Sequence, residues 1–146
     1  MNVLPRLFTI AFLAPISVAS AETAVDWMGD AEIRRTFGGI SIDGVYADGV
    51  KFTESYTEGG RITYRDPRKA MSGRWSVVNH AFCTLYDEYS SGGCFKVSRH
   101  SANCYEFYFL TGNESEAAAA EGIRPNWTAL GWDRTKPATC DEKPAV

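Results

Sequence analysis

The sequence predicts a mainly β protein: an antiparallel meander of six to eight strands with two short helices, closed as a small barrel or left as a curved open sheet. Three observations predict this class. Short runs of alternating apolar and polar residues follow one another closely, glycine-rich turns separate them, and four cysteines lie in the second half of the chain. An even cysteine count in an exported chain indicates a fold held by disulfides.

The first 21 residues are typical of a removable export signal. Arg6 is their only charge, the stretch from Leu7 to Val18 is mostly apolar, and Ala19-Ser20-Ala21 offers the small residues that a signal peptidase accepts. The apolar stretch has about 12 residues, whereas a membrane-spanning helix needs about 20. We therefore expect a signal peptide at 1–21, a single β-rich domain at 22–146, a periplasmic or secreted location and no membrane span.

The charge balance argues against two classes of partner. The chain carries 15 lysines and arginines against 18 aspartates and glutamates, a net charge of −3. Nucleic acids and anionic membrane surfaces require a basic patch, so neither is an expected partner. The two histidines are His80 and His100, and neither has an aspartate or glutamate nearby at a spacing typical of metal ligands. Both are expected in surface turns. We expect no metal site, no cofactor and no catalytic motif.

The segment from Asp26 to Phe37 is expected to contain a short helix. Asp30 can cap its first turn, Ile33 and Phe37 fall on one face, and Gly38-Gly39 ends it. A second helix is expected at Asn113–Ala120, where helix propensity is highest.

Between and after these helices, residues alternate with the two-residue period of strands. In the run from Lys51 to Thr57, for example, Phe52, Glu54 and Tyr56 share one face, and Glu58-Gly59-Gly60 then turns the chain. The most aromatic strand, Asn103–Thr111, has apolar residues on both faces and is expected to be central. The expected strands are Ile40–Tyr46, Lys51–Thr57, Arg61–Arg65, Ser72–Val78, Phe82–Tyr86, Cys94–Arg99, Asn103–Thr111 and Trp127–Trp132.

The four cysteines allow three pairings, and we predict Cys83–Cys94 with Cys104–Cys140. The first pair brackets a turn-like run from Asp87 to Gly93, so the two residues can face each other across a hairpin. The second pair would fix the C-terminal tail to a strand. A zinc site is disfavoured because the chain has no Cys-x-x-Cys spacing.

Several of these runs resemble those of short exported bacterial β-rich proteins of unknown function, and the resemblance implies a fold without an activity. The runs are Gly73-Arg74-Trp75-Ser76-Val77, Phe82-Cys83-Thr84-x-Tyr86-Asp87, Gly92-Gly93-Cys94-Phe95 and Asn103-Cys104-Tyr105-Glu106-Phe107-Tyr108. Gly73-x-Trp75 also resembles the lipocalin signature. In lipocalins the motif lies on the first strand, whereas in this chain it lies near the middle of the sequence. By that analogy, a small barrel with an apolar interior would hold a small ligand.

Two carboxylates in aromatic strands, Glu54 and Glu106, are the candidates for chemistry. If their faces point inward, burial would raise the pKa, as in a general acid. The favoured alternative is cross-strand pairing with a basic residue, namely Arg61, Arg65, Arg74 or Lys96. With their neighbours, they give the candidate ligand-binding residues Glu54, Tyr56, Arg74, Trp75, Glu106 and Tyr108.

Three hypotheses of function follow from these patterns. The leading one is an exported, non-enzymatic binding or accessory protein of the periplasm or cell envelope, whose ligand is a protein, an envelope component or a small apolar molecule. The second is a small hydrolase that uses Glu54 or Glu106. The third is a structural envelope protein.

Overall fold

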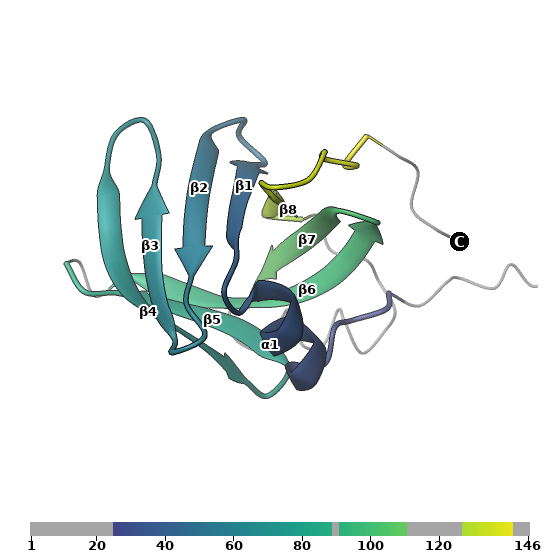
Figure 1. Ribbon diagram of the computed structural model, residues 1–146, viewed down its shortest axis with the longest axis horizontal. Coiled ribbons are helices and arrows are strands. Elements are labelled where there is room, and N and C mark those ends of the chain that lie inside the picture. Colours follow the sequence, from purple (N-terminus) through teal and green to yellow (C-terminus); the bar gives the residue numbers. More distant parts are fainter. Residues whose placement is uncertain (1–24, 89–90, 111–126, 142–146) are drawn as a thin grey trace, which may run out of the picture.

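The computed structural model describes residues 25–88, 91–110 and 127–141, which form a closed barrel of eight antiparallel strands and one helix (Figure 1). The strands follow one another round the barrel in sequence order. The elements are α1 (Asp30–Phe37), β1 (Ser41–Tyr46), β2 (Lys51–Tyr56), β3 (Arg61–Arg65), β4 (Ala70–Val78), β5 (Ala81–Tyr86), β6 (Gly92–Ser101), β7 (Cys104–Phe109) and β8 (Ala129–Asp133).

Pairing of the first strand with the last closes the barrel. Residues 42–46 of β1 pair antiparallel with residues 129–133 of β8, from Ile42 opposite Asp133 to Tyr46 opposite Ala129. The fold is therefore the predicted eight-stranded meander, and of the two predicted forms it is the closed one. The predicted signal at 1–21 and the predicted second helix at 113–120 lie outside the described residues.

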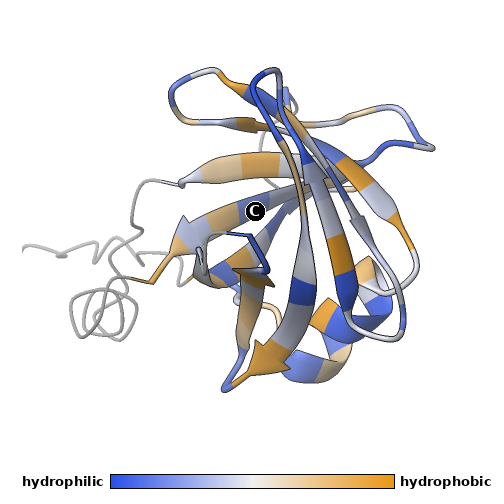
Figure 2. Cartoon of the chain, turned by 90° about the vertical axis from the view of Figure 1, so that its left-hand side faces the viewer, coloured by the Kyte–Doolittle hydropathy of each residue, from blue (hydrophilic) through white to orange (hydrophobic). Residues whose placement is uncertain are grey.

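Alternation along most strands, clearest on β3 and β4, separates the interior of the barrel from its surface. On β4, Met71, Gly73, Trp75 and Val77 are buried, and each residue between them is exposed. Figure 2 shows apolar and polar positions alternating along the strands in the same way. The period of two therefore builds one continuous core from single faces of the strands.

Residues with positive φ make the tight connections. Asn79 (φ 49°) and His80 (φ 61°) form the two-residue turn between β4 and β5, a conformation suited to the twist of a hairpin. Gly73 serves another need, because a Cβ there would lie 2.1 Å from the carbonyl oxygen of Leu85. The glycine of the Gly-x-Trp motif thus lets β5 pass close to β4.

Helix α1 covers one end of the barrel and places Phe37 in the core. Ile33 and Phe37 are fully buried. The Phe37 ring lies between 5.2 and 5.9 Å, centroid to centroid, from four rings of the barrel, which are Tyr56, Phe82, Tyr105 and Phe107. The apolar face predicted for this helix is the face that packs.

The helix begins differently from the prediction. Gly29 is its N-cap, without a side-chain cap, and Asp30 is its first residue. The Asp30 carboxylate instead accepts a hydrogen bond from the backbone N–H of His80 at 2.8 Å and contacts the His80 Nδ1 at 2.9 Å. Asp30 therefore connects α1 to the turn between β4 and β5, and the predicted capping role is wrong.

Both disulfides have the predicted pairing. Cys83 and Cys94 lie directly opposite each other on β5 and β6, with their Cα atoms 4.0 Å apart. Cys140 joins the segment after β8 to Cys104 at the start of β7. The strand β6 is longer than predicted, since Gly92 and Ser101 also belong to its ladder.

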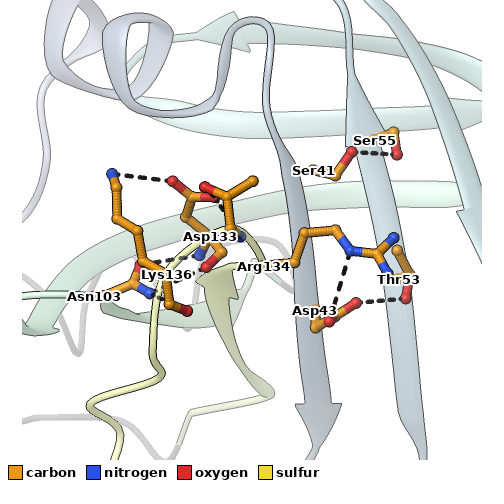
Figure 3. A network of polar contacts seen from close by, with 9 residues as sticks. Ser41, Asp43, Thr53, Ser55, Asn103, Asp133, Arg134 and Lys136 are labelled. Atoms are coloured by element: carbon orange, nitrogen blue, oxygen red, sulfur yellow. Dashed lines mark hydrogen bonds and ion pairs between the residues drawn. The ribbon is translucent and has the colours of Figure 1, made fainter.

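The segment after β8 is also held by Asn103 (Figure 3), which precedes Cys104 of the second disulfide in the sequence. Its side-chain amide donates to three carbonyl oxygens, of Asp133 at 3.1 Å, Lys136 at 3.3 Å and Pro137 at 2.9 Å. Its Oδ1 accepts from the backbone N–H of Asp133 at 3.0 Å. One buried side chain thus supplies hydrogen-bond partners for backbone groups that lie outside the strand pairing of the sheet.

Because the strands alternate in direction, the barrel has two distinct ends. The helix end carries α1, the turns at 57–60, 79–80 and 102–103, and the segment fixed by Asn103. The opposite end carries the connections at 47–50 and 66–69, and we call it the cavity end because an internal cavity lies toward it. In the described part of the chain, no helix is long and apolar enough to cross a membrane.

Candidate functional site

A cavity of about 180 Å³ lies inside the barrel toward the cavity end. Aromatic and aliphatic side chains make up most of its described wall, and one of the described lining residues is a carboxylate. The described lining residues are Ile42, Tyr46, Phe52, Glu54, Phe82, Thr84, Tyr86, Gly92, Phe95, Phe107 and Ala129. The cavity resembles a ligand pocket in composition, being mainly apolar with a few polar groups.

Glu54 lies inside the barrel because it shares the inward face of β2 with Phe52 and Tyr56. The residue is 8% exposed. The Tyr56 hydroxyl donates to its Oε2, and the Tyr86 hydroxyl, from β5 across the interior, donates to its Oε1. Each carboxylate oxygen therefore has a tyrosine partner.

The predicted pairing of Glu54 with a basic residue is wrong. In the described ranges, no lysine, arginine or histidine contacts this carboxylate. The reason is geometric, because the basic residues of the neighbouring strands occupy the alternate, outward face. Arg61 and Arg65 on β3 and Arg74 on β4 are all exposed.

Burial dominates the electrostatics of this carboxyl. Desolvation raises the pKa of Glu54, and the hydrogen bonds from Tyr56 and Tyr86 oppose the shift. Burial also raises the pKa of both tyrosines, and the nearby Glu54 charge adds to this effect. Burial raises the pKa of Tyr46 to about 12. The tyrosines are therefore neutral hydrogen-bond donors around a carboxyl that folding makes harder to ionise.

Replacing Glu54 by glutamine is expected to change how stability depends on pH. Since the folded pKa is raised, the folded protein binds more protons than the unfolded chain between the unfolded and the folded pKa. The wild type should lose stability relative to Glu54→Gln as pH rises above the ordinary value of 4.5. The slope should be at most about 1.4 kcal/mol per pH unit and should level off above the folded pKa.

Urea unfolding from pH 4 to pH 8 measures this difference. Glu58→Gln, the same substitution at an exposed position, is the control. Parallel profiles for Glu54→Gln and the wild type would show that burial does not perturb this carboxyl.

The second predicted carboxylate, Glu106, belongs to a separate cluster on the outward face of β6 and β7. It is 3% exposed and accepts hydrogen bonds from Ser98 Oγ at 3.0 Å and from the Tyr108 hydroxyl at 2.6 Å. His100 Nδ1 lies 2.8 Å from its Oε1. The Trp27 ring packs edge-on against Tyr108 at 5.1 Å and helps to cover the cluster.

This cluster corrects two predictions. In the described part of the chain, Glu106 contacts Ser98, His100 and Tyr108, and it does not contact Lys96 or the arginines proposed as partners. The His100 side chain is 15% exposed, so it is not a surface turn residue. It lies near the end of β6, which continues through Ser101. His80, in contrast, is in the exposed turn between β4 and β5.

The structure separates the six candidate ligand-binding residues into three places. Glu54 and Tyr56 lie together in the interior, and the Trp75 ring packs 5.8 Å from Tyr56 toward the helix end. Glu106 and Tyr108 lie together on the outward face of β7. Arg74 is exposed on β4, away from both groups. Only Glu54 among the six lines the cavity.

Sequence reasoning missed most of the cavity wall. Tyr86 and Thr84 share a face with Phe82, so the two-residue period indicates that they point inward together. The same period places Tyr46 on the face of Ile42. What the period does not give is which residues meet across the interior, because this depends on closure of the barrel.

The described residues contain no group of three or more histidines, cysteines, aspartates or glutamates placed to hold a metal ion. Comparison of the sequence with models of known protein families finds no match, and comparison with curated proteins finds none either. Geometry and chemistry of the described residues are therefore the basis for a functional assignment.

Proposed function

We propose that this chain is an exported binding protein that holds a small, mainly apolar molecule inside its barrel. The observation that carries the proposal is the cavity of about 180 Å³, whose wall is aromatic and aliphatic apart from Glu54, Thr84 and the tyrosine hydroxyls. Small apolar cavities of about 150 Å³ in proteins bind molecules the size of benzene. A single ring with one polar substituent is therefore the expected size of ligand.

The two disulfides support the extracytoplasmic part of the proposal. Disulfides form and persist in oxidising compartments. The signal-like residues 1–21 point the same way, and export to the periplasm or the medium is part of the proposal.

Binding is favoured over hydrolysis because of the groups around each carboxylate. In the described residues, Glu54 contacts two tyrosines and no second carboxylate, whereas a two-carboxylate hydrolase needs a paired acid at a defined separation. Glu106 lies under Trp27 and Tyr108, outside the cavity. A purely structural envelope protein would not need a carboxyl buried in a cavity, a feature that lowers stability.

The test uses a cavity-filling variant. Benzyl alcohol should bind the disulfide-bonded protein with an affinity between high micromolar and millimolar, because a ligand this small makes few contacts. Ala129 is buried in the cavity wall, so Ala129→Leu should weaken binding at least about tenfold by occupying the space. Saturation-transfer NMR with titration measures both affinities.

The matched control is Ala31→Leu, the same substitution at an exposed position of α1, at the other end of the barrel. It should bind benzyl alcohol as the wild type does. Equal binding by Ala129→Leu and Ala31→Leu would place the ligand elsewhere, and no binding of benzyl alcohol, benzylamine or benzoate by the wild type would refute the proposed function.

A further inference from the structure

Resting on the proposed function, we infer that the barrel selects a ligand with a positively charged amine, and that Glu54 is the counter-ion. The ligand class is a protonated amine or quaternary ammonium joined to a single ring or a short apolar chain. The polar end would lie against Glu54, and the apolar body would lie among the aromatic rings toward the cavity end.

The first step is the hydrogen-bonding pattern at Glu54. Tyr56 and Tyr86 donate to different oxygens of the carboxylate. Donors on both oxygens suit the ionised form, because a protonated carboxyl would use one oxygen as a donor itself. The local geometry is therefore built for a negative charge.

The second step is the charge balance around this site. Ile42 lies directly opposite Glu54 on β1, and the titratable side chains around it are tyrosines: Tyr64 directly opposite on β3, Tyr86 across the interior on β5, Tyr56 on β2 itself and, close enough to interact with its charge, Tyr46 on β1. None of them carries a positive charge. In the described residues, a negative charge at Glu54 thus has hydrogen-bond donors but no cationic partner, and burial opposes its ionisation.

Charged groups of both signs lie on the connections at the cavity end. Asp66 accepts from the Tyr64 hydroxyl at 2.8 Å, and the Lys69 ammonium lies 5.8 Å from the centroid of the Tyr64 ring. Asp48 is a further negative charge near Tyr46, and none of these three described residues contacts the Glu54 carboxylate.

The third step is the wall itself. Six of its eleven described residues are aromatic, namely Tyr46, Phe52, Phe82, Tyr86, Phe95 and Phe107. The faces of such rings attract cations, and aromatic walls with a carboxylate are suited to ammonium groups. An anionic ligand would face both the ring electrons and Glu54, so this wall should exclude it.

The experiment compares three probes with the same ring: benzylamine, benzyl alcohol and benzoate. Titration at pH 7 should give benzylamine an affinity at least about tenfold above that of benzyl alcohol and no detectable binding of benzoate. Binding of benzyl alcohol as tight as that of benzylamine would overturn the inference and leave the proposed function standing. Absence of binding by all three would overturn both.

Glu54→Gln separates charge from shape. This variant should reduce the benzylamine affinity at least about tenfold and remove the preference for benzylamine over benzyl alcohol. Glu58→Gln, at an exposed position, should retain the preference for the amine. A Glu54→Gln protein that still prefers benzylamine would contradict the assigned counter-ion.

Proton release gives an independent readout. Calorimetry in buffers of different ionisation enthalpy should show that benzylamine binding releases protons in the pH range where Glu54 titrates, because the cation favours the ionised carboxylate. The release should be absent in Glu54→Gln. Equal proton release by both proteins would show that another group responds to the ligand.

Discussion

Phe37→Ala is expected to lower the free energy of unfolding by about 3–5 kcal/mol, the usual cost of truncating a buried aromatic side chain. Phe37 is fully buried and its ring packs against rings from β2, β5 and β7. The substitution therefore opens a void between α1 and the barrel. Guanidinium unfolding of the oxidised protein, followed by tryptophan fluorescence, measures the change.

Two further variants serve as controls for burial and for side-chain volume. Phe109 is 40% exposed, so Phe109→Ala should cost less than half as much. Phe37→Leu retains much of the volume and should fall between the two. Equal losses for Phe37→Ala and Phe109→Ala would show that α1 contributes little to the core.

Asn103→Ala is expected to cost about 3 kcal/mol. The side chain donates to three carbonyl oxygens and accepts from one backbone N–H, and an unsatisfied buried polar group costs about 1–3 kcal/mol. Asn103→Asp should be no better, because a carboxylate would face the same three carbonyl oxygens. Chemical unfolding with Cys104–Cys140 intact isolates this effect from that of the disulfide.

Lys136 provides a comparison within the same segment. Its Nζ lies 3.0 Å from Asp133 Oδ2, but its side chain is 68% exposed, so Lys136→Ala should cost less than about 1 kcal/mol. If Asn103→Ala costs no more than Lys136→Ala, water replaces the lost hydrogen bonds and the network does not hold the segment.

Local pattern was sufficient to predict the strands, because most of them bury a single face and the exception, β7, is apolar on both. The alternation of Phe52, Glu54 and Tyr56 predicts their shared face, and the structure places all three in the interior. The run between Cys83 and Cys94 predicts a hairpin, and the two cysteines are direct partners in its ladder. These features depend on residues close together in sequence.

Closure of the barrel could not be predicted in this way, since it depends on pairing between β1 and β8, the first and the last strand in the sequence. Tyr86, one of the two partners of Glu54, was missed for a similar reason. Cross-strand reasoning considers adjacent strands, whereas Tyr86 reaches Glu54 across the interior from β5. His100 was misplaced because the end of β6 was predicted two residues too early, which left a buried strand residue in a supposed turn.

The even number of strands has a consequence for handling the protein on a surface. In an eight-stranded meander, the first strand starts and the last strand ends on the same side, here beside α1. A biosensor tether attached through the segment after β8, which Cys140 fixes to Cys104, would therefore hold the barrel by its helix end. This attachment would direct the cavity end toward the flowing solution, so immobilised protein should keep the ligand preference measured free in solution.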